Sequence, residues 1–550
     1  MALTSLPFAA FALITGIIYF ALPNKEHRWV VLLIASSFFY VYNSFQYTVF
    51  ILITIVTIYL AAGKMAAITA ETKAAVKAHK AEWSKDEKKA FKEAANKSKR
   101  RVLAATLLLN FGILFLLKYF NFLSGSIAAM LGGSPDDSLQ IHLLLPLGIS
   151  FYTFIATGYL IDVYRETAEP ERNIFKFALF VSFFPQIIQG PISSFEKLHH
   201  QLIEPHDPEW INFKQGVMNI SWGVFKKIVI ADRVWIAIKA YNANGGIHGG
   251  TVDGEAFAGY GGTAVLFVAL LYALQLYADF SGGIDISRGI CQVIGIDLEV
   301  NFRRPYFSRS ISEYWRRWHI TLGAWMKNYV FYPVAMSGIA KSISTSIAES
   351  RFGQTAAGKH TAKVFTTAMA SFIVFMLIGI WHGANSRYIG FGLWNGIIIM
   401  LSALLGPVYD RSRAALHINS DAAWWKLFQM LRTFIIVLVG YYFDIAENFT
   451  NALQMLWLTL TDQSLSVFRE QLPSLALVKE EYAAVLVCTL VLLYFSIRME
   501  KMSVDTPAEV LERRSGPVQW LALFLLLICI LIAGVYGPMA DPADFIYMQF

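Results

Sequence analysis

The chain has 550 residues, of which 56% are hydrophobic and only 15% are charged, whereas about a quarter of the residues in a soluble domain are charged. Its mean hydropathy of +0.48 excludes an ordinary cytosolic enzyme and predicts helices that are solvated by lipid. The net charge is +7, and segment 61–101 alone holds twelve Lys/Arg and five Asp/Glu, an excess of the same size. The basic character belongs to one loop, so it gives no reason to expect nucleic acid as a partner.

Twelve apolar runs are long enough to cross a bilayer, which takes about 20 residues or somewhat fewer with polar flanks. The first run follows an uncharged start without a small-residue cleavage site, so we expect a membrane span rather than a signal peptide. The sequence therefore predicts an all-α polytopic membrane protein. The predicted spans are 7–22, 29–43, 46–63, 102–120, 143–161, 217–240, 263–280, 364–381, 389–407, 425–445, 483–497 and 518–537.

The loops between these runs alternate in charge, and loops rich in Lys and Arg lie on the cytoplasmic side. Loops 121–142 and 241–262 contain neither residue, and loop 446–482 is acidic on balance. We expect these three loops outside the cell, and with them both termini. The Lys-rich loop 64–101 is composed of good helix formers with opposite charges one turn apart, so it predicts a solvated cytoplasmic helical hairpin.

Two apolar segments are interrupted by proline or glycine. Residues 180–192 contain Pro185 and Gly190, and residues 325–336 contain Pro333. Such residues free backbone groups that hydrocarbon cannot satisfy, so these segments must be packed in protein or line a wet cavity. We predict re-entrant or interfacial helices around an internal site.

Two histidines are candidates for chemistry. His382 ends the apolar run 372–381, where desolvation favours a neutral imidazole that can act as a base. His319 lies in the segment SISEYWRRWHITL, whose density of Trp and Arg is also typical of an interfacial amphipathic helix. The simpler alternative for His382 is a capping histidine at the membrane interface.

Several basic residues lie near His319 in the sequence. Lys327 and four arginines near His319 would form a cytoplasmic surface suited to the phosphates of a nucleotide-like donor. These arginines are Arg303, Arg304, Arg316 and Arg317.

The three cysteines, Cys291, Cys488 and Cys529, have neither disulfide-framework nor metal-ligand spacing, so we expect small core residues and no metal site.

The last six residues, 545–550, read FIYMQF and form an apolar aromatic tail where an exposed terminus would be polar. Tyr547 is the one chemically reactive side chain among them. The tail is therefore predicted to insert into a cavity, with a hydrophobic end resting on the bilayer surface as the alternative.

Five motifs occur in the order seen in membrane-bound O-acyltransferases, the MBOAT family. They are FFPQIIQGPI (183–192), YADFSGGID (277–285), NFRRPY (301–306), YWRRWHITL (314–322) and WHG (381–383). Within that family the chain resembles the bacterial branch that acylates alginate, peptidoglycan and, more distantly, teichoic acid. The tail is similar to the branch's FIYFxF motif, although Met548 replaces a phenylalanine and Gly282-Gly283 replaces a commoner Gly-aromatic pair.

The resemblance implies an MBOAT fold with a central funnel. His382 matches the family's invariant histidine, His319 matches a second and more cytoplasmic histidine, and Tyr547 matches a tyrosine held to carry the acyl group. The motif or tunnel residues expected on the same basis are Trp381, Asp279, Trp315 and Trp318. The implied domains are 1–63 (N-terminal transmembrane helices), 64–101 (Lys-rich loop), 102–407 (catalytic core), 408–537 (C-terminal transmembrane helices) and 538–550 (extracytoplasmic tail).

The resemblance implies that the protein transfers an acyl group across a bacterial cytoplasmic membrane from a cytoplasmic thioester such as acetyl-CoA. The acyl group is expected to be acetyl. Tyr547 would pass it to an extracytoplasmic SGNH-hydrolase-like acyltransferase that O-acetylates a polysaccharide, and no tightly bound cofactor is expected. Two alternatives remain open. One is a transporter of an acylated or lipid-linked precursor, and the other is an enzyme that acylates lipid or protein directly.

Overall fold

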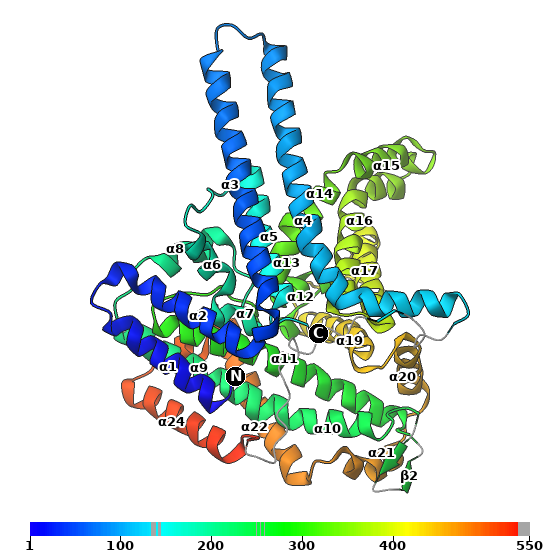
Figure 1. The fold of residues 1–550 in the computed structure, drawn as a ribbon. Helices are drawn as coiled ribbons and strands as arrows, with labels where there is room; N and C mark the ends of the chain where they lie inside the picture. The colour runs from blue at the N-terminus through cyan, green and yellow to red at the C-terminus, as the bar shows by residue number, and fades with distance from the viewer. Residues whose placement is uncertain (134–138, 141–144, 249, 253–254, 258, 537–550) are drawn as a thin grey trace. The chain divides into compact units, whose positions relative to one another are not determined.

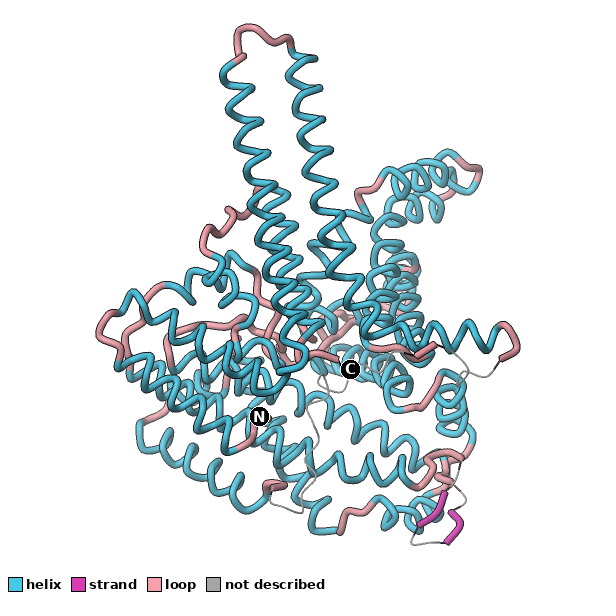
Figure 2. The backbone as a smooth tube through the Cα atoms, viewed as in Figure 1, coloured by secondary structure: helices cyan, strands magenta, loops and turns pink. Residues whose placement is uncertain are grey.

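The computed structural model describes residues 1–133, 139–140, 145–248, 250–252, 255–257 and 259–536. They form two compact units. The first comprises Met1–Val217 and Ser287–Glu299, and the second comprises Met218–Ile286 and Val300–Phe550. Helices dominate the described residues of both units (Figure 2), as the sequence predicts.

The first unit begins with α1, whose N-terminus is capped by the Ser5 side chain, which accepts a hydrogen bond from the Phe8 N–H. Helix α9 ends beyond the unit boundary. The α-helices are α1 (Leu6–Ala21), α2 (Arg28–Ser44), α3 (Thr48–Ala78), α4 (Lys85–Met130), α5 (Ile149–Arg165), α6 (Ile174–Ser182), α7 (Phe184–Gln189), α8 (Phe195–Ile203) and α9 (Trp210–Val224). Short 3₁₀ turns are η1 (Lys25–His27) and η2 (Phe45–Tyr47).

The described residues of the second unit include two π-helices, η4 (Phe225–Ala231) and η6 (Lys327–Phe331), and one antiparallel hairpin of β1 (Gly250–Val252) and β2 (Glu255–Phe257). Its α-helices are α10 (Asp232–Ala243), α11 (Gly262–Val293, which runs into the first unit's range), α12 (Ile311–Arg317), α13 (Ile320–Met326), α14 (Tyr332–Ala335), α15 (Gly338–Glu349), α16 (Ala356–His382), α17 (Ser386–Leu404), α18 (Gly406–Ala415), α19 (Ala423–Ile445), α20 (Phe449–Thr461), α21 (Leu465–Gln471), α22 (Lys479–Met502), α23 (Pro507–Glu512) and α24 (Gly516–Ala533). Its 3₁₀ turns are η5 (Pro305–Phe307), η7 (Phe352–Gln354) and η8 (Leu472–Leu475).

Within the described residues, eight helical stretches are long and apolar enough to cross a membrane. They are Lys25–Ala78, Lys85–Met130, Gly262–Val293, Ala356–His382, Ser386–Leu404, Ala423–Ile445, Lys479–Met502 and Gly516–Ala533. The first holds two predicted spans, 29–43 and 46–63. Predicted spans 7–22, 143–161 and 217–240 coincide with shorter or interrupted helices. A helix thus lies at every predicted position, and twelve crossings stay a prediction.

The Lys-rich segment forms the predicted helical hairpin. Helices α3 and α4 extend through it side by side (Figure 1), and α4 starts with a capping box between Ser84 and Glu87. Glu166 pairs with Lys99 at 2.8 Å and with Lys73 at 2.9 Å. Glu166, the residue that follows α5, therefore ties both helices of the hairpin to the end of α5.

The first interrupted segment is buried, as predicted. Its chain bends at Phe183 between α6 and α7, and every residue from Phe180 to Ile192 is buried. Four amide atoms of Gln186 and Gln189 have no hydrogen-bond partner among the described residues. Leaving one such buried group unsatisfied costs about 1–3 kcal/mol, which fits a segment beside a wet or ligand-filled space. The second segment is helical too, as α13, η6 and α14.

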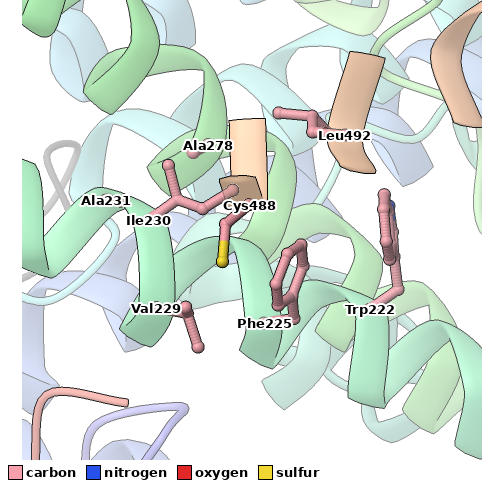
Figure 3. Close-up of a cluster of buried hydrophobic side chains, with 8 residues drawn as sticks. All are labelled: Trp222, Phe225, Val229, Ile230, Ala231, Ala278, Cys488 and Leu492. Atoms are coloured by element: carbon pink, nitrogen blue, oxygen red, sulfur yellow. The ribbon is translucent and has the colours of Figure 1, made fainter. Parts of the chain in front are cut away.

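A buried apolar cluster joins η4, α11 and α22 in the second unit. It consists of Trp222, Phe225, Val229, Ile230, Ala231, Ala278, Cys488 and Leu492 (Figure 3). Partly buried Cys529 packs against it, and all three cysteines of the chain are free. Cys488 is thus the small core residue that its spacing predicts.

Candidate functional site

His319 and His382 both stand where a helix ends or begins. His319 precedes α13 in a left-handed conformation, with φ of 45°. His382 is the last residue of α16, and the chain turns away at Gly383. A Cβ atom at Gly383 would lie 2.4 Å from the Tyr388 ring, so only glycine allows this close approach.

One cavity of about 510 Å³ is lined by both histidines. The sequence separates them by a long stretch, and the fold of the second unit brings them together at one cavity. Most of the remaining lining is apolar, contributed by α13, η6 and α16. The polar or charged lining residues besides the histidines are Trp315, Arg316, Trp318, Lys327, Thr367 and Ser371.

His319 is held in an apolar environment. Its side chain is 3% exposed, and the Phe280 ring meets the imidazole ring edge-on with 4.7 Å between the ring centroids. Burial, with the nearby His382 adding to the effect, lowers the pKa of His319 to about 3. Its imidazole is therefore neutral at physiological pH and can accept a proton or a hydrogen bond.

Aromatic rings frame His382. Its ring stacks on the Tyr388 ring with 6.0 Å between the ring centroids. The centroid of the His382 ring lies 5.3 Å from that of Phe391, which it meets edge-on, and 5.1 Å from that of Trp381. Trp381 also lies 6.3 Å from the His319 ring, so it contacts both histidines although it does not line the cavity.

Trp315 and Trp318 line the cavity. The indole Nε1 of Trp315 is buried, and no hydrogen-bond partner for it is found in the described part of the chain. A buried donor beside a cavity can bind an oxygen atom of a molecule in it. Trp315 is therefore a candidate contact for the substrate.

The four predicted donor-binding arginines gather around a second cavity of about 550 Å³. Three acidic residues share it. Arg304 pairs with Glu500 at 2.6 Å, and Arg317 pairs with Glu500 at 3.0 Å. Arg303 pairs with Asp505 at 3.1 Å, and Glu313 pairs with Arg317.

The predicted cationic surface is therefore largely neutralised by acidic groups. Arg316 differs from the other three because it lines both cavities and forms no ion pair among the described residues. Of the four arginines, Arg316 is the one placed to bind an anion between the two cavities.

Asp279 lies away from the histidine cavity. It is fully buried and accepts a hydrogen bond from Lys227 at 2.7 Å, and Lys227 also pairs with Asp232 at 2.7 Å. Lys226 pairs with Asp285 at 2.8 Å. Asp279 thus belongs to a buried charge network rather than to the lining of the cavity.

This network was not predicted from the sequence. Its signal was present, because Lys226 and Lys227 interrupt the apolar run 217–240, where lysine is costly unless paired. Both lysines lie on the π-helix η4, a form of helix that is frequent at functional sites.

Tyr547, Met548 and the whole predicted domain 538–550 lie outside the described residues. Among the residues that are described, no group of three or more His, Cys, Asp or Glu side chains could hold a metal ion. The arrangement that remains is two histidines in one largely apolar cavity, with Arg316 and Lys327 at its lining. Such a site can remove a proton from an attacking hydroxyl group and bind an anionic donor.

Comparison with known proteins places these features in a family. Residues 170–348 match the model of the membrane-bound O-acyltransferase family. The range includes His319 and all four arginines, and it ends before His382.

Similar proteins act on several cell-surface polymers, as their names state. The chain is 31% identical over 457 residues to a probable alginate O-acetylase of Pseudomonas putida, covering 80% of this chain and 82% of the relative. It is 29% identical over 400 residues to a peptidoglycan O-acetyltransferase of Helicobacter pylori, covering 66% and 65%. It is 28% identical over 326 residues to a teichoic acid D-alanyltransferase of Streptococcus thermophilus, covering 58% and 71%.

Proposed function

The chain belongs to the membrane-bound O-acyltransferase family, and on that basis we propose that it carries an acetyl group across a bacterial cytoplasmic membrane for O-acetylation of an extracellular or cell-surface polysaccharide. It is a multi-pass membrane acyltransferase. The observation that supports this proposal most strongly is the cavity shared by His319 and His382, with Arg316 beside it. The names of the relatives support a polymer acceptor such as alginate or peptidoglycan.

The proposed donor is acetyl-CoA or a similar cytoplasmic thioester. Arg316 binds a phosphate of the donor, and His319 orients its thioester end in the cavity. The donor phosphates also bind Arg303, Arg304 and Arg317, after the ion pairs of these arginines with Glu500 and Asp505 break. No tightly bound cofactor is required, because the activated acyl group arrives with the donor.

The proposed acyl carrier is Tyr547. Its hydroxyl oxygen attacks the thioester carbon while neutral His382 takes the phenolic proton. The C–S bond then breaks, and the sulfur takes that proton from His382 and leaves as the thiol. A thiol has a pKa of about 8.5 and a phenol of about 10, so the aryl ester lies between thioester and sugar ester in leaving-group ability. Each transfer can then run downhill.

The proposed final step lies outside the membrane. The tyrosyl ester gives its acetyl group to the hydroxyl of an SGNH-hydrolase-like acyltransferase, which passes it to the polysaccharide. Only the acetyl group crosses the roughly 30 Å of hydrocarbon, so neither coenzyme nor polymer needs a transport path.

The direct test is the intact mass of the purified protein after incubation with acetyl-CoA. We expect one acetyl adduct, located on Tyr547 by peptide mapping and removed by mild alkali. A protein that supports polymer acylation yet never carries an adduct would favour direct transfer or acylation of lipid or protein. Flux of an intact precursor without acyl transfer would favour the transporter.

The proposed orientation places the α3–α4 hairpin in the cytoplasm and both termini outside. In a variant lacking the native cysteines, we expect Gln463→Cys to react with an impermeant thiol reagent in intact cells and Lys89→Cys to react only after lysis. Both positions are exposed, so accessibility alone does not explain a difference. The reverse pattern of labelling would invert the membrane topology.

A further inference from the structure

Asn301 is a fully buried residue that binds the turn carrying His319. Its side-chain Oδ1 lies 3.2 Å from His319 Nδ1, 3.0 Å from the Thr321 backbone N and 2.9 Å from Thr321 Oγ1. Its backbone oxygen accepts a hydrogen bond from the Ile320 N–H at 3.0 Å. One asparagine therefore holds both the backbone and the ring of the left-handed His319 turn.

These contacts determine which way the amide of Asn301 faces. A backbone N–H is always a donor, so the atom opposite Thr321 N must be the side-chain oxygen. The same oxygen faces His319 Nδ1, and an oxygen without a proton can only accept. Nδ1 must therefore donate, and a neutral imidazole with its proton on Nδ1 has its lone pair on Nε2.

We propose that Asn301 is a positioning residue that fixes His319 in the Nδ1–H tautomer, so that Nε2 is the acceptor atom in the histidine cavity. The inference rests on the proposed function, in which His319 orients the donor. An Nε2 acceptor suits an N–H or O–H of the bound donor, whereas the other tautomer would place a donor there.

The surroundings of His319 favour the neutral ring that this assignment needs. Phe280 on α11 and Trp381 on α16 face it with aromatic rings. The titratable or charged groups that share its cavity are His382 on α16, Arg316 on α12 and Lys327 on η6. None of these is acidic, so none would stabilise an imidazolium.

The first experiment reads the tautomer by ¹⁵N NMR of histidine-labelled protein in lipid, with His319 identified as the signal missing from His319→Gln. We expect a protonated Nδ1 and an unprotonated Nε2 in the wild type, and a loss of this preference in Asn301→Leu. Asn395→Leu is the matched control, because Asn395 is 3% exposed and its amide nitrogen donates to the Phe391 backbone oxygen, whereas the amide oxygen of Asn301 accepts from the His319 turn. An Nε2–H signal in the wild type, or an unchanged tautomer in Asn301→Leu, overturns the inference.

The second experiment is a double-mutant cycle on kcat/KM for acetyl-CoA. Asn301→Leu removes the hydrogen bond that orients His319 together with the two to Thr321, so we expect a loss of about tenfold with His319 present and little further loss in His319→Ala. A merely structural asparagine would lower both backgrounds equally. Asn301→Asp keeps all three acceptor contacts and should restore folding and the Nδ1–H proton if Asn301→Leu misfolds.

The two proposals fail in different ways. If His319→Ala acylates normally, the role of His319 in the proposed function is wrong, whatever the tautomer. If His319→Ala is impaired and Asn301→Leu is impaired additively, the proposed function stands and the positioning role of Asn301 is wrong.

Discussion

We expect His382→Ala to lower acyl transfer by about 10²–10⁴-fold, the usual effect of removing a general base from the reacting centre. The reason lies in the cavity, where His382 is beside neutral His319 and is framed by the rings of Tyr388 and Phe391. The rate of acetyl transfer from acetyl-CoA in membranes or detergent measures the effect.

His360→Ala is the matched control for His382→Ala. His360 lies on the same helix, α16, but it hydrogen-bonds to the Ala403 backbone oxygen at 3.0 Å and is not part of the histidine cavity lining. We expect its replacement to change stability slightly and the rate much less. Near-normal transfer by a folded His382→Ala protein would remove the general base from the mechanism.

The second large effect is expected at Tyr547. Tyr547→Phe keeps the ring and nearly all its apolar area and removes only the hydroxyl, so a tail that merely anchors should tolerate it. A carrier cannot lose that oxygen. We expect Tyr547→Phe to abolish both the acetyl adduct and transfer to the extracytoplasmic partner, with normal expression and membrane insertion.

Tyr536→Phe tests whether loss of any nearby phenol has this effect. Tyr536 follows α24 and is 57% exposed, so its hydroxyl is accessible but has no proposed role, and we expect full activity. If Tyr547→Phe acylates the polymer at the normal rate, direct transfer assisted by His382 to an acceptor entering from outside becomes the better mechanism.

The sequence predicted well the features that depend on local pattern. Apolar runs located the helices, composition predicted the α3–α4 hairpin, and Pro185 and Gly190 marked the buried, interrupted segment that contains α7. The family resemblance marked His319 and His382 separately as candidate site residues. Their common cavity was not predicted, because nothing local in either segment indicates that they share one.

The charge partners could not be predicted in the same way. Arg304 meets Glu500, 196 residues away, and Lys227 meets Asp279, 52 residues away. Such pairs are set by how the helices pack, and the basic and acidic segments look solvent-exposed or unpaired when read alone. For this reason the arginine cluster predicted a cationic surface, whereas the folded chain places three acidic residues beside the four arginines.

The buried lysines of η4 also affect how the helices are inserted into the membrane during synthesis. A lone lysine at the centre of a membrane helix costs about 2.5–3.5 kcal/mol during insertion. Lys227 has Asp232 close by in sequence, but the partners of Lys226 lie on α11, with Ser281 55 residues later. At about 5–20 residues per second, α11 emerges roughly 3–11 s after Lys226 is synthesised. The α9–η4–α10 segment is therefore expected to wait at the translocon, or beside it, until α11 arrives, so that these helices enter the lipid as a neutralised group.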